Sequence, residues 1–275
     1  MGLSANTNSL SAEHLAAPLA GRVFDVSAWI GSYPFRGIPH SSLDDLKRKM
    51  TELRIERAIV APFEAIFWEN NLDAYEQWAK QLATHSELEL WPVVRPGATH
   101  GLERLLDRFK PRGIRLLPNY HCYRLSDRSV EPILNLARER DMIVQVFARI
   151  ADERWHHMLH LPGVDTADLE YLTSVCPDQR VLISGLNSHS FLAPRLRDQP
   201  MLYADVSRVR GPQFAIEKLV NELPANKLIF GSLWPIQIIE GTLWQITTAE
   251  IKPAQRDAIL FGSAQRLLAG DKQMV

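Results

Sequence analysis

The sequence predicts a single (β/α)8 barrel, in which eight parallel strands alternate with helices. Short apolar runs alternate along the chain with segments of helical spacing. The length of 275 residues fits one barrel of about 250 residues. No Gly-x-Gly-x-x-Gly turn follows the first apolar run, which disfavours the rival, a doubly wound open sheet. We therefore expect a polar tail over residues 1–20 and one barrel domain over residues 21–275.

Strands are expected where β-branched and aromatic residues form short apolar runs that stop at Gly, Pro or polar residues. These runs are residues 22–30, 57–62, 88–94, 113–117, 142–147, 180–184, 201–206 and 227–230. Helical segments separate consecutive runs, so the strands must be parallel and joined by right-handed crossovers.

The clearest helix follows the first loop. Leu43, Leu46, Met50 and Leu53 recur at helical spacing, and Ser41 or Ser42 caps the helix because an acid lies three positions after each serine. The remaining helical segments are residues 67–85, 101–110, 129–140, 152–159, 168–175 and 212–223. Each lies between two predicted strands, as a barrel requires.

The amino-acid composition disfavours some classes of binding partner. Apolar residues make up 46% and charged residues 23% of the chain, and the net charge is -1. This balance disfavours binding to nucleic acid or to an anionic membrane. The two cysteines lie outside any paired metal spacing, no apolar run reaches the roughly 20 residues of a membrane helix, and the start lacks the pattern of a signal peptide. We expect a cytoplasmic protein with a small-molecule ligand, no cofactor and a possible homo-oligomeric state.

Three stretches resemble one family in the same order and spacing. They are Gly113-Ile114-Arg115-Leu116-Leu117-Pro118-Asn119-Tyr120-His121, the run Gly231-Ser232-Leu233-Trp234-Pro235, and residues 259–268. Together they are similar to the amidohydrolase-related family of metal-dependent hydrolases, over about residues 23–268. The resemblance implies a (β/α)8 barrel with its site at the C-terminal ends of the strands.

The chain departs from that family at the metal ligands. The family carries histidines after its first, fifth and sixth strands and an aspartate after its eighth. The residues at these positions here are Ser27, Trp29, Phe147, Ser184 or Gly185, and Leu233. None of these residues binds a divalent cation well. A bound metal lowers the pKa of water from about 15.7 to about 7, so the resemblance implies a barrel without the family's usual hydrolytic nucleophile.

Three polar residues are candidates for catalysis at the same end of the barrel. Arg115 is interpreted either as an anchor for a carboxylate or enolate or as a buried partner of an acid such as Asp205. His121 is a general acid or base on the loop after the fourth strand, or a solvent-facing side chain. Asp205 closes the seventh strand, where it serves as a base or satisfies Arg115.

The replaced ligand positions predict an apolar pocket at the barrel mouth. Candidate substrate-binding residues are Trp29, Tyr120, Phe147, His189, Ser207, Leu233 and Trp234. Two of them have simpler interpretations: His189 follows Asn187 and Ser188, which are good helix caps, and Trp234 is suited to packing. The pair His156 and His160 has the spacing of a helical metal site, but it lacks a third ligand in register.

Three functional hypotheses follow. The first is a metal-independent hydrolase, lactonase-like, or a binder of a small organic acid, with Arg115, His121 and Asp205 as its polar set. The alternative is a non-catalytic pseudoenzyme that acts as a binding or assembly scaffold. The least favoured is a metal-dependent hydrolase or decarboxylase with a site rebuilt from His121, His189 or the pair His156 and His160.

Overall fold

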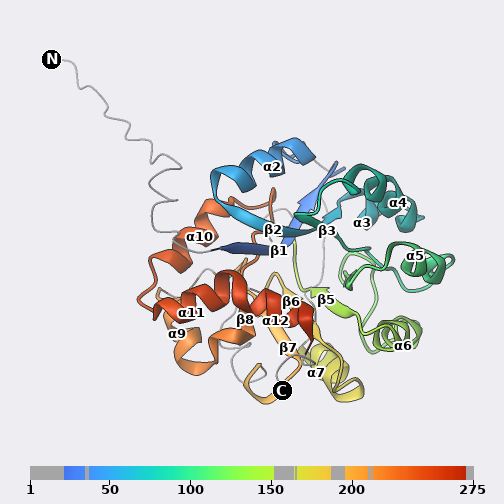
Figure 1. The fold of residues 1–275 in the computed structure, drawn as a ribbon. Coiled ribbons are helices and arrows are strands. Elements are labelled where there is room, and N and C mark those ends of the chain that lie inside the picture. The colour runs from blue at the N-terminus through green and yellow to red at the C-terminus, as the bar shows by residue number, and fades with distance from the viewer. Residues whose placement is uncertain are drawn as a thin grey trace.

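The structure is a computed structural model and describes residues 22–34, 37–151, 164, 166–186, 196–209, 211 and 213–270. Helices surround a ring of parallel strands (Figure 1). The predicted tail and the pair His156 and His160, with the helix expected around them, lie outside the described residues, as does His189.

Eight strands form two parallel sheets. The first sheet has the order β1–β2–β3 and the second the order β4–β5–β6–β7–β8. Their bounds are β1 (Val23–Ile30), β2 (Ile55–Pro62), β3 (Leu88–Leu90), β4 (Gly113–Leu116), β5 (Ile143–Phe147), β6 (Val181–Ser184), β7 (Leu202–Asp205) and β8 (Leu228–Ile229). All eight overlap predicted runs, although their bounds differ, as for β2, which was predicted over residues 57–62.

Backbone hydrogen bonds join the two sheets at both of their edges. Between β3 and β4, Arg115 donates its N–H to Pro92 O (2.8 Å) and accepts at its own O from Val94 N (2.9 Å). Between β8 and β1, Val26 N donates to Phe230 O (3.1 Å). These contacts close the strands into a ring, so the predicted (β/α)8 fold class is confirmed.

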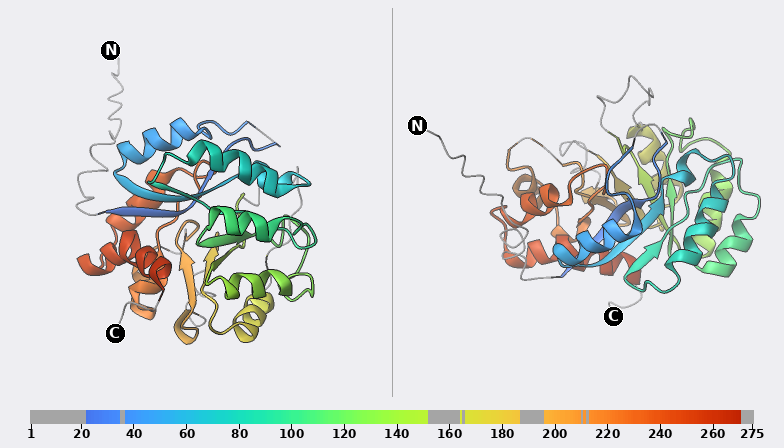
Figure 2. Two further views of the ribbon diagram at one scale, coloured as in Figure 1. Left: turned by 45° about the vertical axis from the view of Figure 1, so that its right-hand side comes forward. Right: turned by 90° about the horizontal axis from the view of Figure 1, so that it is seen from above.

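Helices follow the strands and form the outer layer, which both views of Figure 2 show around the sheet. They are α2 (Leu43–Glu52), α3 (Glu64–Phe67), α4 (Asn71–Leu82), α5 (Leu102–Phe109), α6 (Glu131–Glu139), α7 (Thr166–Val175), α9 (Ala215–Glu222), α10 (Ile239–Thr247), α11 (Pro253–Asp257) and α12 (Ser263–Ala269). A π-helical turn over Ala258–Gly262 joins the last two. None of the helices in the described ranges has the length and apolar character that crossing a bilayer requires.

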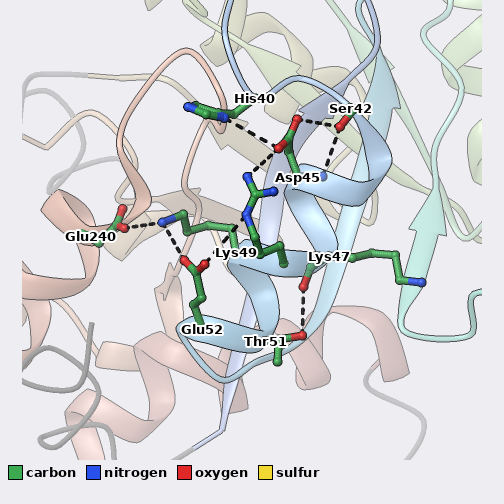
Figure 3. Close-up of polar contacts among 9 residues, drawn as sticks. His40, Ser42, Asp45, Lys47, Lys49, Thr51, Glu52 and Glu240 are labelled. Carbon is green, nitrogen blue, oxygen red and sulfur yellow. Dashed lines mark hydrogen bonds and ion pairs between the residues drawn. The ribbon is translucent and has the colours of Figure 1, made fainter. Parts of the chain in front are cut away.

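The first of these helices shows how the local sequence sets a boundary. Ser42 Oγ accepts from Asp45 N (3.1 Å) and donates to the Asp45 carboxylate (2.6 Å), so Ser42 and not Ser41 is the cap. On the exposed side, Lys49 bridges Glu52 (2.9 Å) and Glu240 at the start of α10 (2.8 Å), which ties α2 to α10 (Figure 3).

The barrel interior is layered with the period of two that strands impose. Along β5, Ile143 packs in an apolar cluster at the N-terminal end of the barrel and Phe147 packs in a second cluster at the C-terminal mouth. Gln145 lies between them and is also fully buried. A buried polar layer therefore separates two apolar layers.

The helix predicted over residues 67–85 is shorter in the structure, because α3 ends at Phe67 and α4 runs over Asn71–Leu82. Trp68, after α3, has an extended backbone with ψ 144°, and α4 begins at Asn71. The Asn71 amide is buried and donates to Val93 O. This tertiary hydrogen bond sets where α4 begins, and helical spacing alone did not reveal it.

Candidate functional site

An aromatic layer occupies the mouth of the barrel. Trp29 stacks on Phe63 with ring centroids 5.5 Å apart and meets the edge of Phe147 at 5.1 Å. Leu233 belongs to the same cluster, and all four side chains are completely buried. The structure thus brings three of the predicted substrate-binding residues, Trp29, Phe147 and Leu233, into one contact cluster.

This layer does not fit a divalent cation. Trp29, Phe147 and Leu233 carry an indole, a phenyl ring and an alkyl chain, none of which donates a lone pair to a metal. The nearby hydroxyl of Ser27 accepts from Leu233 N (3.2 Å). Across the part of the chain that the structure describes, no three His, Cys, Asp or Glu side chains are grouped to hold a metal ion.

Arg115 lies in the polar layer beneath the aromatic rings. Its Nη1 donates to Ala28 O (2.9 Å), and its Nη2 donates to Val26 O (3.2 Å) and Ile59 O (3.0 Å). Its Nε donates to Gln145 Oε1 (2.9 Å). Four hydrogen bonds to the barrel itself favour the structural interpretation of Arg115, with carbonyl groups and an amide as its direct partners.

The guanidinium also faces the mouth layer. Arg115 Cζ lies 4.8 Å from the ring centroid of Trp29 and 5.2 Å from that of Phe147, a cation–π arrangement that favours the charged form. Burial lowers the pKa of Arg115 to about 9, and the charges of Asp25 and Asp205 oppose that shift. Arg115 is thus still a cation at neutral pH, stabilised by two buried carboxyl groups.

Those two carboxyl groups sit in networks of serines. Asp25 accepts from Ser27 N (3.1 Å), Ser232 N (2.9 Å) and the Ser232 hydroxyl. Asp205 Oδ1 accepts from the Ser207 hydroxyl (2.6 Å) and Ser207 N (3.1 Å). Burial raises the pKa of Asp25 to about 6, and it also raises the pKa of Asp205.

Gly231 allows the two networks to approach each other. A Cβ at this position would lie 2.4 Å from Ser27 Oγ and 2.7 Å from Asp205 Oδ2. Because real side chains avoid such contacts, the close approach requires glycine. The Gly-Ser pair of the sequence is therefore a packing requirement in the barrel interior.

His121 lies apart from this polar layer, on the loop after β4. Its Nε2 lies 2.9 Å from Ile66 O, and its ring stacks near Tyr123 at 6.4 Å. Burial lowers its pKa to about 4, so the imidazole is neutral at pH 7. The structure brings Arg115 and Asp205 into the same layer but places His121 elsewhere, and the catalytic role of the three stays a prediction.

Three further residues were predicted to bind substrate, and they differ in whether they contact the aromatic layer. Tyr120 is half-buried and packs edge-on against Phe67 (5.9 Å), beside the aromatic layer. The Ser207 hydroxyl donates its hydrogen bond to Asp205. Trp234 is buried, and its ring centroid lies 6.4 Å from that of His40. Of these three, Tyr120 alone packs with the mouth cluster.

Arg208 follows Ser207 after the C-terminal end of β7 and was not among the site residues predicted from the sequence. It is 8% exposed, and its Nη1 lies 3.4 Å from Ile150 O and 3.3 Å from Ala151 O. Its charge lowers the pKa of Tyr120, against a larger upward shift from burial. The signal that points to Arg208 is its place directly after a strand, where barrel enzymes hold their functional groups.

A model of the amidohydrolase family matches residues 14–269. The chain belongs to the amidohydrolase family. The match confirms the resemblance that the three sequence stretches carry. It also covers most of the chain. No curated protein matches the sequence.

Solved structures of the family share the fold at low sequence identity. An uncharacterized TIM-barrel protein of Bordetella bronchiseptica is 16% identical, with a TM-score of 0.68, over 90% of this chain and 98% of that one. A 2,6-dihydroxybenzoate decarboxylase of Rhizobium is 12% identical, with a TM-score of 0.69, over 90% and 99%. A dihydroxybenzoic acid decarboxylase of Polaromonas, solved with manganese and an inhibitor, is 14% identical, with a TM-score of 0.67, over 90% and 97%. Membership of the family supports function of the hydrolase type.

Proposed function

We propose that this amidohydrolase-family protein works without a metal and binds a small organic acid at the mouth of its barrel. The observation that carries the proposal is the packed aromatic layer of Trp29, Phe147 and Leu233 at the positions where the family holds its ligands. A cation there would lose its hydration shell and gain no donor in return.

Binding is favoured over family-type hydrolysis by the arrangement of the polar groups. Arg115 and Asp205 are completely buried or nearly so, and their hydrogen bonds go to neighbouring barrel groups. His121 lies on the loop after β4 and is hydrogen-bonded to Ile66 O in α3. A general base must reach the reacting atom within hydrogen-bond distance, and this set offers no such shared point.

Arg208 supplies the positive charge that an acid ligand needs. It lies at the end of β7 and acts electrostatically on Tyr120, whose ring borders the aromatic layer. A guanidinium beside aromatic rings is suited to a carboxylate carried on a flat body. The dihydroxybenzoate decarboxylases among the structural neighbours handle ligands of this kind, which supports an aromatic acid as the ligand class.

The proposal is tested first by the metal content. Purified protein is expected to contain zinc, manganese and iron far below one equivalent by elemental analysis, and prolonged chelation should leave its melting temperature unchanged. Stoichiometric metal that resists dialysis would reject the metal-independent function.

The second test is binding. We expect 2-hydroxybenzoate to raise the melting temperature, because a ligand of the native state stabilises it by mass action. Arg208→Gln should abolish this shift and Arg208→Lys should keep part of it, while Arg128→Gln, at an exposed arginine, serves as the matched control. An equal shift in Arg208→Gln and the control would reject the anchor.

The alternative is a pseudoenzyme scaffold with no small ligand. It is favoured by the same mouth layer, because side chains already fill the space above Arg115. A scaffold predicts no shift with any aromatic or aliphatic acid and no hydrolysis of simple lactones. A shift in melting temperature that depends on Arg208 would reject the scaffold. Lactone turnover would also reject the scaffold, and it would restore the lactonase-like hypothesis.

A further inference from the structure

A pocket lies at the opposite, N-terminal end of the barrel from the mouth. It has a volume of about 510 Å³ and is lined by the C-terminal ends of α5 and α6, the residue before β6 and the end of α12. In Figure 1, α5 and α6 lie next to each other in the outer ring. The volume is within the range of pockets that hold small molecules, about 300–1,000 Å³.

Two of its arginines are held by acids. Arg140 Nη2 donates to Asp107 Oδ1 (3.0 Å), and the Asp107 side chain is 69% exposed at the rim. Arg112 binds both carboxylate oxygens of Glu89. Glu89 is shared with Arg57, whose Nη2 lies 3.8 Å from Glu89 Oε2. Both pocket guanidinium groups, of Arg112 and Arg140, line the pocket with N–H groups to spare.

A third arginine forms the inner wall. The Arg180 side chain is only 10% exposed, and its Nη1 donates to Leu267 O (2.7 Å). Its Nη2 donates to Asp141 Oδ1 (2.9 Å) and Asp141 O. These bonds hold the guanidinium in place from both sides, so a ligand would meet a donor group that is already ordered.

Lys110 gives the pocket its excess charge. Among the described residues, no carboxylate lies within ion-pair distance of Lys110, whereas each of the three arginines has one. Lys110 ends α5 in the left-handed region, with φ 48°. A lysine is uncommon in that conformation, and Lys110 is one of the residues that line the pocket. Each lining arginine has an acid partner, so Lys110 adds one positive charge that no described acid pairs.

The rest of the lining is apolar. Leu106, Met142 and Leu268 border the same pocket, from α5, from the start of β5 and from α12. These side chains offer a surface for an apolar body, and Met142 adapts its shape readily. A site with one excess charge and such a surface matches a ligand that carries one negative charge on an apolar frame.

We propose that this pocket is a binding site for a small organic monoanion with an apolar body. The anionic group is held by Lys110 with help from the N–H groups of Arg140 and Arg180, and the body lies against Met142 and Leu268. The site is separate from the mouth of the barrel and independent of the function proposed there.

The probe is 2-naphthoate, measured by titration calorimetry, with 2-naphthamide as the neutral analogue and inorganic phosphate as the anion without an apolar body. Each analogue should bind about fivefold or more weakly than 2-naphthoate, since it lacks either the charge or the apolar area. Binding of 2-naphthoate should also weaken as salt is raised. Equal affinities for the acid and the amide would overturn the charge argument.

Lys110→Asn is the decisive variant, because asparagine tolerates the left-handed conformation and removes the charge. It should lower the affinity for 2-naphthoate about fivefold with no loss of thermal stability, and Lys80→Asn, at an exposed lysine at the end of α4, should change nothing. The titration is repeated in Arg208→Gln, which removes the mouth anchor. Binding that disappears in Arg208→Gln and survives in Lys110→Asn would overturn this inference and leave the function proposed for the mouth intact.

Discussion

At the scale of single residues, Gly231 leaves no room for a side chain. Its missing side chain lets Ser27 and Asp205 reach the same point of the barrel interior. Gly231→Ala places a methyl group 2.4 Å from Ser27 Oγ and 2.7 Å from Asp205 Oδ2. Both side chains are held by buried hydrogen bonds, to Leu233 N and to the Ser207 hydroxyl. We expect a loss of about 1–3 kcal/mol in the free energy of unfolding, measured with urea.

The matched control for that experiment is Gly241→Ala in α10. No atom lies within 4 Å of a Cβ built on Gly241. A glycine inside a helix is less stable than alanine by about 0.5–1 kcal/mol, so Gly241→Ala is expected to stabilise the protein. Equal effects at the two glycines would contradict the packing argument.

Asp25 should make stability depend on pH. Its folded-state pKa of about 6 lies above the ordinary value of 3.8, because it is buried. The folded state therefore binds this proton more tightly, and raising the pH from about 4 to about 6 removes stability from the wild type. Relative to Asp25→Asn, the wild type is expected to lose up to about 3 kcal/mol over this range.

The measurement is urea unfolding at several pH values for both proteins. Their difference cancels the titration of groups that the two proteins share. Asp44→Asn, on the exposed side of α2, is the control variant. A constant difference for Asp25→Asn would show that the carboxyl group is not protonated in the folded protein.

At the scale of elements, the start of α2 tests how far local sequence decides a boundary. Ser42 provides the hydrogen bonds to Asp45, while Ser41 contributes its carbonyl group to Gly31 N (2.8 Å). Ser42→Ala should cost about 1 kcal/mol of stability, and Ser41→Ala should cost little, because its side chain caps no helix. Thermal unfolding of the two variants distinguishes them, and the reverse order would assign the cap to Ser41.

Strand lengths were the least predictable property of the elements. The run over residues 88–94 forms a strand only over Leu88–Leu90, because Pro92 has no N–H for a ladder. The chain nevertheless stays extended, since Val93 forms an isolated bridge with Arg115. The run over residues 227–230 likewise forms a strand only over Leu228–Ile229, after a 3-10 turn at Ala225–Lys227.

At the scale of the whole molecule, Arg115 joins strands from both sheets. It donates to carbonyl groups of β1 and β2 and to Gln145 of β5, across the centre of the barrel. Arg115→Met would leave those carbonyl groups unpaired and remove the cation that faces Asp25 and Asp205. We expect a loss of about 3–5 kcal/mol in the free energy of unfolding.

Arg115→Lys should recover part of this loss, because it keeps the charge but lacks the planar fork that reaches several carbonyl groups at once. Arg104→Met, at an exposed arginine of α5, is the control and is expected to be nearly neutral. If Arg115→Met unfolds at the same urea concentration as the control, Arg115 would regain its interpretation as a ligand anchor.

The sequence alone determined the fold class, the order of the elements and the family. Alternating strand and helix patterns depend on local periodicity, and the stretches around residues 113–121 and 231–235 carry the resemblance directly. The same resemblance predicts that Trp29, Phe147 and Leu233 stand where the family carries metal ligands, and this assignment stays a prediction. That these three side chains would share one apolar cluster followed from their places at strand ends.

Only the tertiary structure decided which polar side chains meet and how each is satisfied. Arg115 bonds to carbonyl groups from distant strands, His121 turns to Ile66, and Arg208 lies beside the mouth. Hydrogen bonds of this kind depend on distances between elements far apart in sequence, and residue patterns within one element carry no such distances. The position of a strand was therefore predictable, while the partner of a buried charge was decided by the closed barrel.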